Sequence, residues 1–303
     1  MALTVVRPGM LTTIQDLGRW GHQDSGVPVA GPMDWYSHRL ANRLVGNDER
    51  AASLEITLIG PEIEVSAETV CAVTGAEFEL TVNGSATAGG RAFVIPSGGR
   101  LRFGVRRRGA RAVLAVRGGL DVPAMFGSRA TSLSAPMGPF GGRALMAGDM
   151  LPVGTSSMRA EQKGVALPLP HGGARLRILR GPHDAMFTPA GWGTLSRARF
   201  VVTPESNRMG YRLHGPSLEH RAAPEILSEA TPIGSIQVPG SGQPILLMAD
   251  RQTTGGYPKI GTVITADLPA AGQLAPGDWI EFQECTRPEA VDALHALAAR
   301  LST

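Results

Sequence analysis

The segment from Asp250 to Lys259 is the part of the chain most able to do chemistry. It reads DRQTTGGYPK and follows Pro244–Ala249, an apolar run with the pattern of a buried strand. It supplies a carboxylate, a guanidinium, a carboxamide, two hydroxyls and an ammonium. Its two adjacent glycines let the backbone turn tightly and bring N–H groups close to a ligand. A binding loop at the end of a rigid strand is the functional interpretation, and a long solvated loop is the structural alternative.

We expect this segment and nearby charged residues to form one concave pocket. Lys259 is one of two lysines among 29 Lys plus Arg, and a lysine shifts its pKa on burial more readily than an arginine. We expect its side chain to face the pocket and to contribute little packing. Lys259 or Arg208 would stabilise a carboxylate or a developing oxyanion, and Asp250 or Glu229 would move the proton. The expected catalytic residues are Asp250, Lys259 and Glu229. The expected substrate-binding residues here are Gln252, Thr253, Thr254, Gly255, Gly256, Tyr257, Arg208, Arg212 and Glu225.

Two other interpretations of the charged residues stay open. Arg208 and Arg212 are four residues apart and could together clamp a carboxylate or phosphate, or each could pair with Glu225 or Glu229. A second polar block near the N-terminus contains Gln15, Asp16 and Arg19. It would bind an anion or an amide, or an Asp–Arg pair would simply hold an Ω-like loop.

Composition excludes several classes of function. The net charge is only +3, and the one basic cluster, Arg106–Arg108 with Arg111, has the position of a hairpin tip without interleaved aromatic residues, which argues against nucleic-acid binding. Cys71 and Cys285 are far apart and the histidines lack ligand spacing, so we expect no metal site and a reducing compartment. We find no signal peptide and no apolar run near ~20 residues, which predicts a cytoplasmic protein without membrane contact. There is no Walker loop and no G-x-S-x-G elbow.

Short strand-like runs separated by Gly, Pro and Asn turns predict a mainly β protein with few helices. The two expected helices are Met33–Val45 and Pro288–Leu301. Four sequence anchors recur in the same order in both halves, for example Gly148-Asp149 and Gly277-Asp278. We therefore expect two β-barrel-like domains related by internal duplication, at residues 1–160 and 174–303, joined by a linker near Gly154–Gly173.

Several motifs together resemble one known family. They are QDLGRWG, GVPVAGPMD, RLANRLVGN, LEITLIGP, RMGYRL, EILSEATPIGSIQVP and ADRQTTGGYPKI. They look like the allophanate hydrolase subunit 2 family, also called the biotin-dependent carboxyltransferase or KipA-like family, which includes one of the subunits of bacterial 5-oxoprolinase. The resemblance covers nearly the whole chain and implies cyclophilin-like β-barrel domains.

The resemblance also implies a function that needs other chains. The expected activity is that of a subunit of an ATP-dependent 5-oxoprolinase, a hydrolase that opens 5-oxoproline to glutamate, acting with a KipI-like (allophanate hydrolase subunit 1) chain and a LamB/YcsF-like third subunit. ATP would act at the level of the complex, and the chain alone would be inactive. One alternative is the carboxyltransferase half-site of a urea carboxylase, with carboxybiotin carried by another chain. The other is a non-catalytic KipA-like regulator of a KipI-like kinase inhibitor.

One position departs from the family pattern. Ala30 stands where the family often has a serine before Gly31. If that hydroxyl contacts substrate in relatives, this member would differ in specificity.

Overall fold

The computed structural model describes residues 1–160, 164–221 and 223–301. Its contacts divide the chain into two units, which are described separately. The first comprises Met1–Trp20, Ala30–Leu169 and Ala299–Thr303, and the second comprises Gly21–Val29 and Pro170–Ala298.

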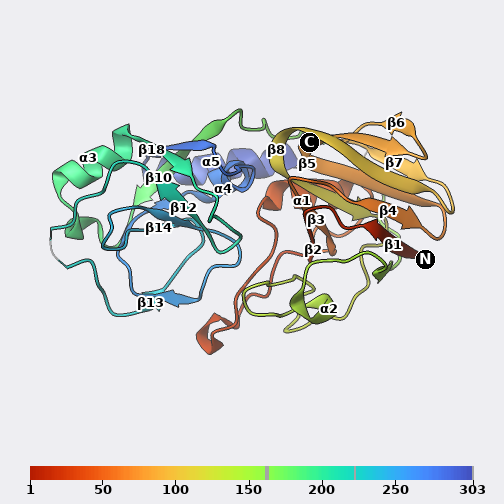
Figure 1. Cartoon of the computed structure of the whole chain (residues 1–303), viewed down its shortest axis with the longest axis horizontal. Helices are drawn as coiled ribbons and strands as arrows, with labels where there is room; N and C mark the ends of the chain where they lie inside the picture. The colour runs from red at the N-terminus through yellow and green to blue at the C-terminus, as the bar shows by residue number, and fades with distance from the viewer. Residues whose placement is uncertain (161–163, 222, 302–303) are drawn as a thin grey trace. The chain divides into compact units, whose positions relative to one another are not determined.

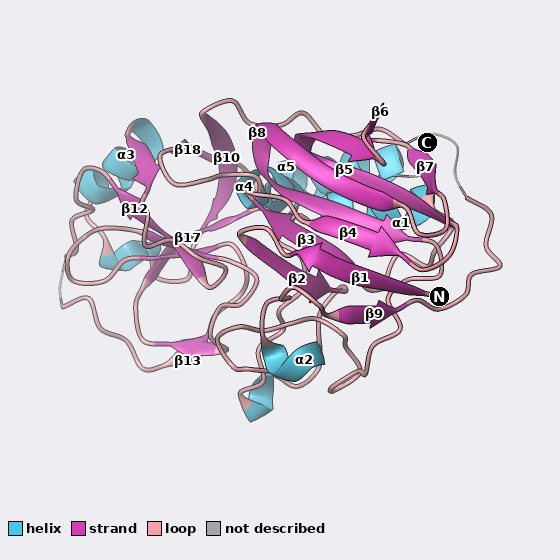
Figure 2. Ribbon diagram, turned by 45° about the vertical axis from the view of Figure 1, so that its right-hand side comes forward, coloured by secondary structure: helices cyan, strands magenta, loops and turns pink. Residues whose placement is uncertain are grey.

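The first unit is built on a nine-stranded sheet. Its order is β2-β3-β8-β4-β1-β9, with β5 paired to β8 and carrying β6 and β7 (Figure 2). The strands are β1 (Ala2–Arg7), β2 (Leu11–Gln15), β3 (Ser53–Thr57), β4 (Glu62–Val65), β5 (Thr69–Val82), β6 (Ser85–Thr87), β7 (Ala92–Ile95), β8 (Arg100–Val116) and β9 (Met150–Pro152). The apolar residues of one face, such as Leu54, Leu101 and Leu114, form the core.

The long strand β8 corrects one expectation. Arg106–Arg108 is not a hairpin tip, because β8 runs through it without reversing. The pairing of β8 with β5 instead shifts register three times between Gly75 and Leu80. Such bulges bend and twist a strand without ending it. Gly109 lies in this bulged region with φ +69°, a backbone conformation that favours glycine. In the sequence alone, a glycine after three arginines looks the same as a turn.

Helix α1 (Trp35–Leu44) packs against β5 and β8 (Figure 1). It begins where Asp34 caps it, since Oδ1 of Asp34 accepts the Ser37 N–H at 2.9 Å. Its buried face carries Tyr36, Leu40 and Leu44, and also His38, whose Nδ1 lies 2.9 Å from Oγ of Ser53. The predicted helix Met33–Val45 is therefore confirmed.

The second unit contains a closed seven-stranded barrel. Its order is β10-β17-β14-β15-β12-β11-β18, and a parallel pairing of β18 with β10 closes it. The strands are β10 (Gly173–Arg180), β11 (Arg199–Val202), β12 (Gly210–His214), β14 (Ser235–Gln237), β15 (Ile245–Leu247), β17 (Lys259–Val263) and β18 (Trp279–Glu284), with a separate two-stranded ribbon of β13 (Glu229–Ala230) and β16 (Thr254–Gly255).

The remaining elements are helices and 3-10 turns, and all of them except the 15-residue α5 are short. They are α2 (Pro139–Gly142), α3 (Pro189–Arg197), α4 (Leu268–Gly272), α5 (Arg287–Leu301) and the 3-10 turns η1 (Gln23–Ser25), η2 (Asp184–Met186) and η3 (Thr265–Asp267). The predicted C-terminal helix is confirmed as α5. Helix α3 was missed because Gly191 and Gly193 lower its helix propensity, yet Thr188 caps it by accepting the Gly191 N–H at 3.0 Å.

The mainly β class with few helices is confirmed. Only the second of the two expected barrels closes within the described residues, and the first unit is a curled open sheet. The recurring Gly-Asp turn has the same local bonds in both halves, because Oδ2 of Asp149 accepts the Met146 N–H and Oδ2 of Asp278 accepts the Ala275 N–H, each at 2.8 Å. The following strands pair differently, since β9 is antiparallel to β1 and β18 is parallel to β10. The duplication and the boundaries 1–160 and 174–303 stay predictions.

The buried His38 should make the stability of the first unit depend on pH. Burial lowers the pKa of His38 to about 4 from its ordinary 6.5. Between pH 6.5 and 4, His38 therefore binds a proton in the unfolded chain but not in the folded chain. The free energy of unfolding consequently falls by about 3 kcal/mol as the pH drops from 6.5 to 4. We expect His38→Gln to remove this part of the slope in urea unfolding, whereas His214→Gln, at an exposed position, should keep it. Equal slopes in all three proteins would contradict the assignment.

Candidate functional site

A buried ion pair holds the start of the predicted loop. Arg208, just before β12, donates from Nε to Oδ2 of Asp250 at 3.0 Å and from Nη2 to Oδ1 at 3.1 Å, and both side chains are buried. The Asp250 N–H also donates to the Arg208 carbonyl at 2.8 Å. Both carboxylate oxygens of Asp250 therefore bind the guanidinium fork, a geometry that favours positioning of the loop over proton transfer.

Lys259 lies under the β13–β16 ribbon. Its side chain is only 3% exposed, and Nζ donates to the Ala230 carbonyl at 3.1 Å and to Oε1 of Glu229. Glu229 and Ala230 form β13, which pairs with Thr254 and Gly255 of β16. The expectation that Lys259 contributes little packing is therefore wrong, because the ribbon covers its side chain.

His183 completes this cluster, although sequence reasoning did not select it. Its Nδ1 accepts the Lys259 N–H at 3.2 Å, so the proton of the neutral ring is on Nε2, which lies 3.4 Å from Oε1 of Glu229. Donation from Lys259, aided by the nearby His183, holds the pKa of Glu229 below its ordinary value. The spacing of histidines in a sequence bears only on metal binding, and no local pattern connects His183 to Lys259.

Two carboxamides lie side by side next to Gly255. Nε2 of Gln252 donates to Oε1 of Gln237 at 3.3 Å, and Gln237 is a buried residue of β14. A Cβ at Gly255 would lie 2.8 Å from Nε2 of Gln237 and 3.2 Å from Nε2 of Gln252, so a larger residue here would push the two amide groups out of place. Gln237 was also missed, and the available signal was an amide between the apolar residues Ile236 and Val238.

Thr231 fixes the middle of the loop. Its Oγ1 donates to the Gln252 carbonyl, and its N–H donates to the Thr253 carbonyl at 3.1 Å. Its own carbonyl accepts from Nε of Arg251 at 2.7 Å. Burial lowers the pKa of Arg251 to about 10. These contacts make Arg251 structural and hold the Gln252 backbone in place.

Other predicted residues lie at the margin of this cluster or away from it. Thr254 and Tyr257 are exposed on and beside the ribbon, and Glu225 is exposed. Arg212 lines a different hollow of about 240 Å³, near Glu205, so the structure does not bring it to Asp250.

The N-terminal polar block binds backbone of its own unit. Asp16 accepts from the Gly18 N–H at 2.9 Å and from Oγ of Ser128 at 2.6 Å. Gln15 donates to the Thr131 carbonyl at 3.0 Å, and Arg19 donates to the carbonyl of Ala130. These bonds favour the loop-holding interpretation for Gln15, Asp16 and Arg19.

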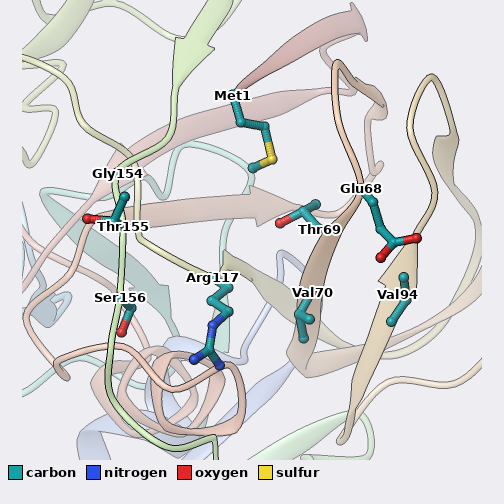
Figure 3. A pocket seen from close by; sticks show the side chains of 9 residues that line it. All are labelled: Met1, Glu68, Thr69, Val70, Val94, Arg117, Gly154, Thr155 and Ser156. Atoms are coloured by element: carbon teal, nitrogen blue, oxygen red, sulfur yellow. The ribbon is translucent and has the colours of Figure 1, made fainter.

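A surface hollow of about 330 Å³ in the first unit holds none of the predicted residues (Figure 3). Its lining includes Thr69 and Val70 of β5, Val94 of β7 and the guanidinium of Arg117. Arg117 already donates to the carbonyls of Val45, at 3.2 Å, and Met158, at 3.0 Å, which gives it a structural role.

The described residues contain no group of three or more His, Cys, Asp or Glu side chains that could hold a metal ion. Within the same residues, no helix is long and apolar enough to cross a membrane.

Comparison with known families decides the classification. The model described as "Carboxyltransferase domain, subdomain A and B" matches residues 25–284. The chain belongs to this carboxyltransferase family. The family resemblance noted from its motifs is thereby confirmed.

Relatives include polypeptides of two kinds of enzyme. The chain is 41% identical to a 5-oxoprolinase subunit of Escherichia coli over 96% of this chain and 94% of that protein. It is 33% identical to urea amidolyase of Saccharomyces cerevisiae, covering 93% of this chain and 16% of that protein. The solved urea amidolyase of K. lactis superposes with a TM-score of 0.91 at 31% identity, over 99% of this chain and 20% of that chain.

Breaking the buried ion pair on one side should destabilise the second unit. Asp250→Asn leaves Arg208 buried without a full counter-charge, so we expect a loss of roughly 3 to 5 kcal/mol in the free energy of unfolding. Arg212→Gln, which changes an exposed arginine of the same strand region, should cost less than about 1 kcal/mol. The check is urea unfolding of both variants, and equal effects would contradict the assigned role of the pair.

Proposed function

We propose that this chain is the carboxyltransferase-family subunit of an ATP-dependent enzyme complex that opens the lactam of 5-oxoproline to glutamate. The observation that carries the proposal is the 41% identity to the 5-oxoprolinase subunit of Escherichia coli, which spans nearly the full length of both proteins. The 5-oxoprolinase subunit of Haemophilus influenzae, which has the same name, is 37% identical over 92% of this chain and 89% of that protein.

The cluster around Lys259 and Gly255 fits a small substrate with an amide and a carboxylate. A carboxamide has two N–H donors and a carbonyl acceptor, so the Gln237–Gln252 pair, which uses one N–H for its mutual bond, can still complement the N–H and C=O of a lactam. Lys259 supplies the positive charge for a carboxylate or for the oxyanion that develops when the amide is attacked. In this proposal Asp250 and Arg208 position the loop, and Thr253 and Tyr257 border the substrate.

Other chains would supply the rest of the reaction. This sequence has no Walker loop, so ATP is assigned to the complex. The proposed partners are a KipI-like chain and a LamB/YcsF-like chain, and the complex is proposed to be a cytoplasmic hydrolase that needs all of its subunits. A KipA-like regulatory role is the outcome if the assembled complex lacks activity.

A carboxyltransferase half-site is the second candidate. The TM-score of 0.91 to the urea amidolyase of K. lactis supports it, although this chain covers only 20% of that protein. In that case biotin would be carried by another chain, and urea would take the place of the lactam next to the carboxamides.

The first test is reconstitution. We expect the purified chain alone to be inactive and the chain with its two partners to hydrolyse ATP in the presence of 5-oxoproline. Lys259→Met should reduce this rate about 100-fold or more, as expected when an electrostatic contact to the reacting group is lost. The assay measures ADP and glutamate. Turnover with urea and carboxybiotin but not with 5-oxoproline would favour the second candidate.

The second test uses Gly255 of the loop. Gly255→Ala places a Cβ 2.8 Å from Nε2 of Gln237 and should displace the carboxamides. Gly193→Ala, in α3, meets its nearest atom, Cζ of Arg197, at 3.9 Å and is the control. We expect Gly255→Ala to raise KM for 5-oxoproline about tenfold, a cost of ~1.4 kcal/mol, and Gly193→Ala to leave it near the original value. Equal KM values would count against recognition by these amides.

A further inference from the structure

Glu229 is the unusual member of the Lys259 cluster, because it is exposed while Lys259 is buried and His183 is partly buried. We propose that the carboxylate of Glu229 occupies a binding site for the carboxylate of a ligand, and that it must leave for the ligand to bind. The chain would thus hold its own site closed with a substitute anion until the ligand displaces it.

The donors of this site converge on one point. Nζ of Lys259 and Nε2 of His183 both face Oε1 of Glu229. Their side chains are 3% and 17% exposed, so both are held by the surrounding structure. A buried ammonium needs a counter-anion, since leaving one unpaired costs several kcal/mol. Oε1 of Glu229 therefore occupies a preformed anion-binding site.

The present occupant is easy to displace. The Glu229 side chain is 44% exposed, so water can solvate its carboxylate once it moves away. It lies on β13, which has only two residues, and the nearby Leu227 is 93% exposed. Release of Glu229 costs little once another anion pairs with Lys259, because water solvates the freed carboxylate. The site thus needs an anion, but not this particular one.

Neighbouring groups indicate what else the ligand carries. Glu229 pairs directly with Gly255, and the position of the missing Gly255 Cβ is the point where the carboxamides of Gln237 and Gln252 meet. A ligand whose carboxylate replaced that of Glu229 would have its remaining atoms close to these amides. The ligand class is therefore a small carboxylic acid with an amide or lactam. This assignment of the amide rests on the proposed function, whereas the carboxylate site does not.

Substitution of Glu229 should open the site. Glu229→Gln keeps the shape of the side chain but removes the anion, and Glu205→Gln removes an exposed carboxylate of the same unit as the control. We expect Glu229→Gln to lower the melting temperature and acetate to restore it. We also expect acetate and 5-oxoproline to bind this variant about tenfold more tightly than they bind the original chain or Glu205→Gln, a gain of ~1.4 kcal/mol.

The test measures melting temperature and the imidazole NMR signals of His183 as acetate, 5-oxoproline or 2-pyrrolidinone is added to the purified chain. Adding Lys259→Met to Glu229→Gln should abolish acetate binding. Equal acetate affinity for Glu229→Gln and the original chain would overturn the proposal. If Glu229→Gln does not fold, acetate must still shift the His183 signals of the original chain in a saturable way that Lys259→Met removes, and absence of that shift would also overturn it.

The two lactam probes separate this proposal from the proposed function. Tighter binding of acetate together with no preference for 5-oxoproline over acetate supports the carboxylate site and counts against 5-oxoproline as substrate. Preference for 5-oxoproline over both acetate and 2-pyrrolidinone supports both.

Discussion

A buried ammonium cannot stay unpaired, and this constraint organises the part of the second unit where β17 meets the β13–β16 ribbon. Lys259 extends from the barrel strand β17 into a place that the β13–β16 ribbon covers. The ribbon brings Glu229 to it and His183 lies beside both. The same ribbon carries Gly255 to the two carboxamides. The two-stranded ribbon therefore holds two features in one place. They are the anion that pairs with Lys259 and the glycine, Gly255, that leaves room for the two carboxamides.

Much of the framework could be predicted because it depends on local patterns. The run Pro244–Ala249 contains the buried strand β15, and the polar loop follows it as expected. Helix α1 lies within the predicted range Met33–Val45. The family followed from motifs that cover most of the chain, and the family model confirms it.

The details of the site depend on partners distant in sequence. His183 is 76 residues from Lys259, and Gln237 is 15 residues from Gln252. No spacing rule links such pairs, because the pairing of β10 with β17 and of β14 with β15 brings them together. The hairpin error at Arg106–Arg108 has a related cause, since a bulge and a turn use the same residues and only the pairing with β5 distinguishes them. Burial of Lys259 could not be predicted either, because the β13–β16 ribbon that covers it has only four residues, too few to give a strand pattern in the sequence.

The parallel pairing of β10 with β18 also determines when the barrel can close during synthesis of the chain. Strand β10 can complete its pairing only with β18, which lies about a hundred residues later in the chain. During synthesis the ribosome therefore releases β12, β15 and the loop before the strand that closes the ring exists. Until then one edge of β10 stays open and able to pair with other chains. During that interval the open edge makes nascent chains of this protein prone to edge-to-edge association with one another.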